Sequence, residues 1–297
     1  MFKISRAAWP TAFAALLLLS TARGEEVAAT LSASATDIAY QHSLIRDRGR
    51  EHGIDFGASI GDFGVRAVYG KSIVKYFGSP ALDQDSYFVS GVYAFNLRDA
   101  QAKVLGGLNL YYVNNNDATR TTDVVNVIEP RLAYVAEEGR LRLELGYARS
   151  SYPYGLRVDQ WSPGIMLGLN DGSDVAQLRG TYIDVSTSSP AQTKTHAASL
   201  EATWTHYLEQ GDVFKPRSIT LSAMFGERVY AVNSDAGSVG NLADVQKGAF
   251  SLTGQWNLPG RWILTGILGE QRFQEKILSV PNGYALRFLF VSVAKQW

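Results

Sequence analysis

The sequence predicts an all-β fold, a single antiparallel barrel preceded by a cleaved N-terminal segment. Apolar and polar residues alternate with a period of two through runs of about ten to fourteen residues. Short polar breaks separate these runs at regular intervals. The final run, Tyr284 to Trp297, is apolar and ends the chain on an aromatic ring. A closed barrel can hold such an ending, because its last strand is paired on both sides.

The first 24 residues have the pattern of a secretory signal peptide. Lys3 and Arg6 precede an apolar stretch from Ala7 to Leu19, and small residues then allow cleavage after Ala22 or Gly24. A retained anchor helix is the alternative, but the apolar stretch is shorter than the ~18 residues that a spanning helix needs. We therefore expect a signal peptide at 1–24, a flexible lead-in at 25–35, and one barrel domain over 36–297.

Alternation is clearest where Leu141, Leu143 and Leu145 alternate with Arg142 and Glu144. Counting such runs between the breaks predicts fourteen strands, with twelve as the alternative because the first two runs are weak. The expected strands are 36–45, 51–60, 64–75, 84–97, 101–113, 122–136, 140–151, 157–169, 174–186, 194–208, 217–231, 246–257, 261–275 and 284–297.

Two prolines fall inside these expected strands. Pro130 and Pro163 each remove one hydrogen-bond donor from the strand ladder. Each therefore predicts either a bulge at that point or an error in the expected strand boundary.

Alternation alone does not decide whether the apolar face meets a core or lipid. Runs of ten or more residues favour lipid, because they suit a tilted membrane crossing and soluble strands centre near five or six. On this strand rhythm, the leader and Trp297, the chain resembles bacterial outer-membrane β-barrel proteins of the porin-like superfamily. The resemblance implies an outer-membrane location, a lead-in on the periplasmic side, and recognition of the last strand by the barrel assembly machinery.

Composition excludes several classes of function. The chain has no Cys, so it has no disulfide, thiol nucleophile or thiolate metal site. Removing residues 1–24 leaves 25 basic and 28 acidic residues, a balance that gives no indication of nucleic-acid binding. No segment after Ala22 is apolar for long enough to form a transmembrane helix.

The polar positions of the alternation predict the residues that line the lumen. Fourteen tilted strands give a backbone diameter of about 28 Å and a lumen of about 10–15 Å. The charged or amide side chains expected to point inward are Asp55, Arg66, Glu129, Arg131, Arg142, Glu144, Arg149, Gln177, Arg179 and Glu201.

Two facing ion pairs are expected among these side chains. Arg131 should lie opposite Glu144, and Arg179 opposite Glu201. Such pairs either create a transverse field that selects solutes by charge or, the preferred interpretation, satisfy polar groups in a partly filled barrel.

The longest loop, 232–245, is the one candidate for a constriction loop, and it is weakly acidic through Asp235 and Asp244. A flexible surface loop is the preferred interpretation of this segment.

No catalytic or metal-binding pattern is apparent in the sequence. His42 and Ser43 are adjacent and so point to opposite faces of a strand, which is poor geometry for a base and its nucleophile. No cluster of His, Asp and Glu has the spacing of a metal site, and no cofactor is expected.

The sequence therefore favours a passive, monomeric, porin-like channel for small solutes. The alternatives are a barrel that serves an envelope export or assembly system, a structural barrel with a plugged lumen, and, less favoured, an outer-membrane lipid hydrolase.

Overall fold

The computed structural model describes residues 27–97, 101–117, 122–136, 139–186, 194–209, 215–240, 244–275 and 282–297. The signal peptide expected at 1–24 lies outside these residues. No helix among them is long and apolar enough to cross a membrane.

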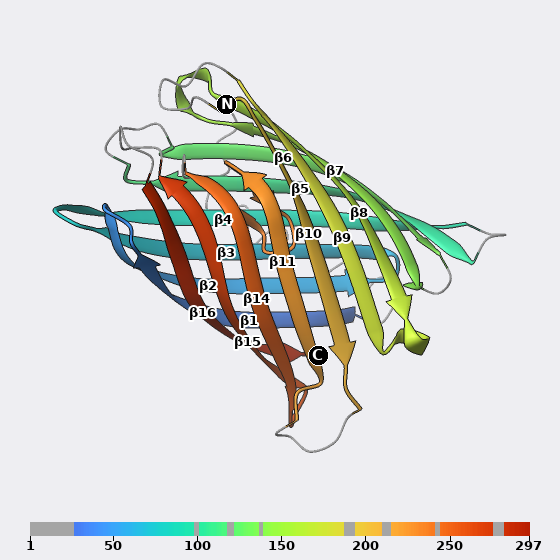
Figure 1. Cartoon of the computed structure of the whole chain (residues 1–297). Helices are drawn as coiled ribbons and strands as arrows, with labels where there is room; N and C mark the ends of the chain where they lie inside the picture. Colours follow the sequence, from blue (N-terminus) through green and yellow to red (C-terminus); the bar gives the residue numbers. More distant parts are fainter. Residues whose placement is uncertain are drawn as a thin grey trace.

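Fourteen antiparallel strands of the described chain close into a barrel, and each pairs with its neighbours in sequence (Figure 1). The two short strands β12 and β13 form a separate hairpin. The strands are β1 Val27–Gln41, β2 Arg46–Ile60, β3 Phe63–Tyr76, β4 Ser79–Leu97, β5 Ala102–Asn115, β6 Val124–Ala136, β7 Leu141–Ser151, β8 Arg157–Leu169, β9 Asp174–Val185, β10 His196–Tyr207, β11 Ser218–Arg228, β12 Val232–Asn233, β13 Ser238–Val239, β14 Val245–Leu258, β15 Trp262–Glu275 and β16 Asn282–Gln296. The expected count of fourteen is confirmed, and twelve is wrong.

The barrel closes where β1 pairs with β16, from Thr30 opposite Gln296 to Gln41 opposite Ala285. The lead-in expected at 25–35 is therefore wrong from Val27 onward, because β1 begins there. Its alternation was weak because small Ala and Ser residues occupy both faces. Tertiary pairing overrides this weak signal, since β16 would otherwise leave an open edge of unpaired backbone groups. The backbone N–H of Trp297 donates to the carbonyl of Ala29 at 3.0 Å, which fixes the C-terminal ring at this seam.

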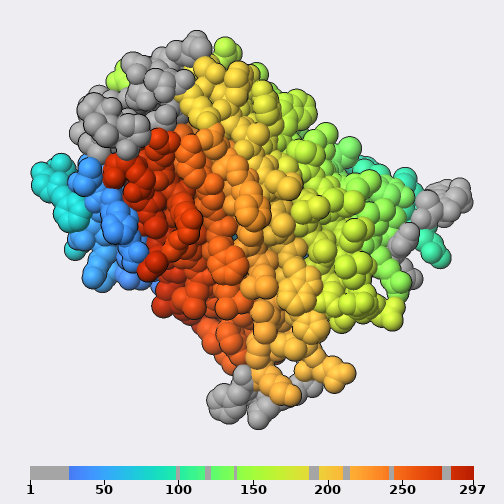
Figure 2. Space-filling model, in the orientation of Figure 1, coloured from blue at the N-terminus to red at the C-terminus, as the bar shows by residue number. Residues whose placement is uncertain are grey.

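The outward face of the barrel is apolar. The strands are 11 to 19 residues long, enough for a tilted crossing of the hydrocarbon layer. Exposed aromatic rings such as Tyr182 and Trp204 lie nearer the strand ends, as in the aromatic girdles of membrane barrels. Figure 2 shows one side of this surface, over the yellow to red strands. Outward aliphatic side chains include Leu143, Leu145, Leu167, Leu178, Leu200, Leu221, Leu252, Leu268, Leu289 and Val291.

Both prolines lie within continuous strands and point outward. On either side of Pro130, Ile128 is opposite Arg149 and Arg131 is opposite Gly146, which is one unbroken register. The register is also unchanged across Pro163. The expected bulges are therefore absent at both positions. Each proline is paired with the strand on one side, and the pairing is interrupted only toward the strand on the other side.

Register shifts occur elsewhere, near the ends of the β2–β3 and β3–β4 pairs and on the two strands that flank the β12–β13 hairpin. The pairing of β11 with β14 shifts between Phe225 and Arg228, and that of β14 with β15 shifts between Gln246 and Gly248. Gly226 has φ +98°, and a Cβ there would approach the carbonyl oxygen of Ala198 to 2.5 Å. Only glycine fits this bend. A bulge bends its strand and increases the local twist. Here the bulge comes just before the point at which the chain leaves the barrel wall and turns into the lumen.

Candidate functional site

The described residues 229–240, between β11 and β14, fold into the lumen. The carboxamide of Gln160 on β8 binds the backbone of Val232 on both sides, donating to its carbonyl and accepting from its N–H, each at 2.9 Å. Gly237, at the hairpin turn, lies against the ring of Phe88 on β4. The preferred interpretation of 232–245 as a surface loop is therefore wrong, and its described residues form an internal constriction. We call the described residues 229–240 the inner hairpin.

Apolar packing holds the inner hairpin against one side of the wall. Val229, Tyr230, Val232 and Val239 form a buried cluster with inward side chains of the neighbouring strands and of the turn after β7. The rings of Tyr152 and Tyr230 lie 4.9 Å apart, and burial raises the pKa of Tyr230 to about 12. This side of the lumen is dry. The wall residues of the cluster are Phe88, Tyr111, Val113, Val125, Val127, Ala148, Tyr152, Leu156, Val158, Ile183, Val185 and Ala197.

Asp235, at the tip of the inner hairpin, binds cations from three strands. Its carboxylate accepts from Arg179 on β9 at 2.6 Å and lies 4.0 Å from the guanidinium of Arg131 on β6. Its backbone carbonyl accepts from Arg66 on β3 at 2.7 Å, and Arg66 also binds Asp55 at 2.7 Å.

The side chain of Asp235 remains 58% exposed, although protein surrounds it on several sides. Desolvation opposes its ionisation, but the charge and hydrogen bond of Arg179, with Arg131 and Arg142, outweigh it and lower the pKa of Asp235. Asp235 is therefore an anion that water in the lumen reaches.

Glu144 on β7 is the second anionic centre. Its side chain is 7% exposed and contacts Arg179 at 2.7 Å, Arg142 at 3.3 Å and Arg131 at 3.4 Å. Three guanidinium groups thus share Glu144, and two of them also contact Asp235. This network joins the hairpin tip to the wall.

The expected facing pairs form only in part. Arg131 is opposite Gly146 rather than Glu144, and its ion pair with Glu144 is diagonal. Arg179 is opposite Glu201 as expected, but Glu201 binds Arg228 at 2.9 Å instead. The hairpin is the physical reason, since Asp235 draws Arg179 toward the centre of the lumen.

Two expected lumen residues are placed differently. Glu129 points inward but is 1% exposed, and it accepts hydrogen bonds from Asn109, Tyr111 and Ser234 of the inner hairpin. It therefore anchors the hairpin and is out of contact with water. Arg149 faces outward, where it binds Asp159 at 2.9 Å, because it shares its parity with Leu143 and Leu145.

A buried charged cluster holds the C-terminal base of the hairpin segment. Arg46, at the start of β2, binds Asp244 at 2.6 Å and lies 3.6 Å from Glu275. Tyr284 donates to Asp244 at 2.9 Å, and Ser43 donates to Glu275. No sequence pattern predicts this cluster, because its members come from four distant segments.

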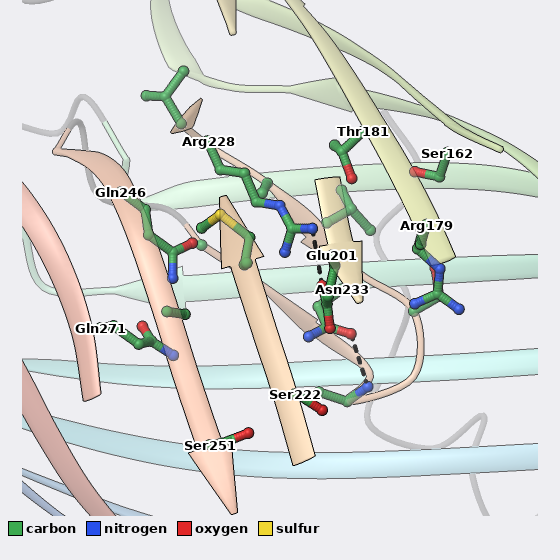
Figure 3. A pocket seen from close by; sticks show the side chains of 18 of the residues that line it. Ser162, Arg179, Thr181, Glu201, Ser222, Arg228, Asn233, Gln246, Ser251 and Gln271 are labelled. Carbon is green, nitrogen blue, oxygen red and sulfur yellow. Dashed lines mark hydrogen bonds and ion pairs between the residues drawn. The ribbon is translucent and has the colours of Figure 1, made fainter. Parts of the chain in front are cut away.

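A cavity of about 520 Å³ lies on the other side of the inner hairpin (Figure 3). Its wall comes largely from β11, β14, β15 and β16. The polar lining includes Arg228, Glu201, Gln246 and Gln271, and the apolar lining includes Met224, Ile267, Phe273, Leu286 and Phe288.

The inward face of the last strands is therefore partly apolar, which the sequence analysis missed. The signal was present in the run Phe288-Leu289-Phe290-Val291, which is apolar at both parities. In an ordinary barrel strand with a polar lumen, only one parity is apolar.

Two of the four histidines, His196 and His206, lie on the outer face of the barrel, away from these charged groups. His196 and His206 face outward and pair with Asp184 at 3.3 Å and Asp174 at 2.9 Å. Within the described part of the chain, no group of three or more His, Asp or Glu side chains could hold a metal ion.

Comparison with known proteins identifies the fold. No family model matches the sequence, and no curated protein matches it. Among solved structures, a FadL homologue of Pseudomonas aeruginosa has a TM-score of 0.52 at 7% identity, over 92% of this chain and 90% of that one. This likeness shows a shared β-barrel fold.

Two other solved structures are less similar to this chain. An outer-membrane channel from Pseudomonas putida F1 has a TM-score of 0.48 at 11% identity, over 92% of this chain and 96% of that one. The outer membrane protein Omp33 of Acinetobacter baumannii has a TM-score of 0.47 at 6% identity, over 91% of this chain and 99% of that one.

Proposed function

We propose that this barrel is a passive, porin-like channel for small solutes in the bacterial outer membrane. The observation that carries the proposal is the exposure of charged side chains inside the barrel. Asp235 is 58% exposed at the hairpin tip, and Arg66 and Asp55 on the wall are about one-third exposed. Buried charges are costly unless they are paired, so solvated charges at the centre of a barrel indicate a water-filled path.

The inner hairpin is the constriction of this channel. It packs on the β4–β10 side and leaves the path to run along β11, β14, β15 and β16, where the cavity lies. The charged groups near its tip include Arg66, Arg131, Arg142 and Arg179 on one hand and Asp55, Glu144 and Asp235 on the other. Because these signs nearly balance, we propose a transverse field with weak selectivity between anions and cations.

Single-channel recording of the refolded mature chain in a planar bilayer tests this function. We expect discrete current steps with a small preference between K⁺ and Cl⁻. A variant in which a short Gly-Ser linker replaces 232–239 should give larger steps, because the constriction is gone. A folded barrel that carries no current, with or without the hairpin, would refute the proposal.

The dry apolar side of the lumen favours the second candidate, a plugged barrel that serves an export or assembly system. In that case the wild type carries no current, the variant without the hairpin does, and a partner co-purifies. We propose a monomer, folded by the barrel assembly machinery through β16 and Trp297.

A lipid hydrolase is less favoured on geometry. The Oγ of Ser43 donates to the buried Glu275, and His42 adopts φ +64° in the adjoining turn. A phospholipid hydrolysis assay on the same preparation checks this alternative.

A further inference from the structure

The cavity beside the inner hairpin has an apolar wall with two amide groups set into it. Leu286 is directly opposite Gln271, and Phe288 is opposite Gly269, across the β15–β16 pair. Gln246 is opposite Phe273 across the β14–β15 pair. Consecutive inward positions of three strands therefore make one surface that is apolar except at Gln246, Ser251 and Gln271, the three polar side chains of these strands that Figure 3 labels.

Gly269 makes room for this surface. A Cβ at position 269 would overlap the ring of Phe288, so the ring occupies the space beside the glycine. Aromatic rings prefer to cover apolar surface, and here Phe288 presents its ring to the cavity instead of to another side chain of β15.

The charges around the cavity are already compensated. Arg228 binds Glu201, Arg179 and Arg131 contact Glu144 and Asp235, and Asp244 binds the buried Arg46. No such compensation exists for the side-chain amides of Gln246 and Gln271, which form no hydrogen bond with another residue of the described chain. The free polar groups of the cavity are therefore neutral, and each both donates and accepts.

We infer that this cavity binds a small neutral amphipathic molecule. Its apolar body lies against Ile267, Phe273, Leu286 and Phe288, and its hydroxyl or carbonyl end bonds to Gln246 and Gln271. A volume of about 520 Å³ falls within the range of small-molecule sites, which are mainly apolar with a few placed polar groups. A charged head would lose its hydration without gaining an unpaired counter-charge. The inference rests on the proposed channel, since the lumen is the route by which such a solute reaches the cavity.

Calorimetric titration of the refolded chain in lipid nanodiscs tests the inference, with empty nanodiscs as the blank. The probes are 2-naphthol and its anionic counterpart 2-naphthoate at pH 7. We expect 2-naphthol to bind in excess of the blank and 2-naphthoate to bind at least about tenfold more weakly. Replacing both amides, Gln246→Leu with Gln271→Leu, should weaken 2-naphthol binding by about tenfold, since two neutral hydrogen bonds are lost.

Phe288→Ala should also weaken binding, while the matched change Leu289→Ala, one position along the same strand on the lipid face, should leave it unchanged. Binding equal to the blank, or equal binding of 2-naphthoate, overturns the inference. So does an equal effect of the two alanine variants. The bilayer recordings separate the two proposals: a conducting barrel that binds no 2-naphthol refutes this inference alone, and a non-conducting barrel that binds it refutes the passive channel.

Discussion

Neutralising Asp235 should loosen the inner hairpin without unfolding the barrel. In Asp235→Asn the shape of the side chain is kept, but the contacts with Arg179 at 2.6 Å and Arg131 at 4.0 Å lose their charge. A hydrogen bond to a charged group contributes ~1.5–3 kcal/mol, and an exposed ion pair less than ~1 kcal/mol. Because Asp235 is 58% exposed and Arg179 keeps its ion pair with Glu144, we expect the free energy that holds the hairpin against the wall to fall by about 1–2 kcal/mol.

That loss raises the fraction of molecules in which the hairpin is detached from the wall by about 5- to 30-fold. Hydrogen exchange of the backbone amides in 232–240, measured in lipid, reports this population directly. The barrel strands should exchange as in the wild type, since Gln160 still binds Val232, Glu129 still binds Ser234, and the apolar cluster still holds the hairpin against the wall.

A matched control is Asp83→Asn, which removes the same charge from an outward ion pair with Lys71 at 2.8 Å. This variant should leave exchange in the hairpin unchanged. Unchanged exchange in Asp235→Asn, or an equal rise in both variants, would show that the carboxylate does not hold the tip.

The same contact makes the hairpin sensitive to acid. The pKa of Asp235 lies below the ordinary value of 3.8, chiefly because Arg179 outweighs the effect of desolvation. A group whose pKa is lowered by the contact stabilises the hairpin in its position against the wall. This stabilisation is full above the ordinary pKa of the group and is lost as pH falls through the lowered value. After correction for intrinsic rates, hairpin exchange in the wild type should rise below about pH 3.8, and Asp235→Asn should lack this contribution.

Three further predictions concern stability, measured by urea titration of tryptophan fluorescence in lipid vesicles. Gly226→Ala should lower the free energy of unfolding by about 1–3 kcal/mol, because alanine at φ +98° is strained and meets the Ala198 carbonyl, whereas Gly91→Ala, with open space at its Cβ, should have little effect; equal losses would contradict the bulge argument. Arg46→Met should cost ~3–5 kcal/mol, since it removes the guanidinium from two buried carboxylates, and a loss under ~1 kcal/mol would show that they relax. Leu145→Arg, on the lipid face, should cost ~2–4 kcal/mol, and a neutral result would place that position outside the hydrocarbon layer.

Period-two alternation determined the barrel, because a strand sends successive side chains to opposite faces whatever its neighbours are. This local rule predicts inward positions for Arg66, Arg131, Glu144 and Arg179, and in the structure these residues form ion pairs with one another, with Asp55 and with Asp235. Arg149 was wrongly assigned to the lumen, because it has the same parity along β7 as the outward Leu143 and Leu145, and the alternation applied consistently places it outside. The weak alternation of β1 concealed its true start, which the pairing with β16 decides.

The direction of the segment after β11 was beyond the sequence. A polar loop with Asp235 at its tip suits a surface as well as a lumen, and the difference lies in partners such as Glu129, Gln160 and Arg179 from distant strands. The sequence by itself determined the sheet, its strand number and the polarity of most of its inner face, since these follow from local geometry. Only the tertiary structure decided which side of the lumen is dry, which charges share a partner, and where a cavity remains, because each depends on side chains that closure of the barrel brings together.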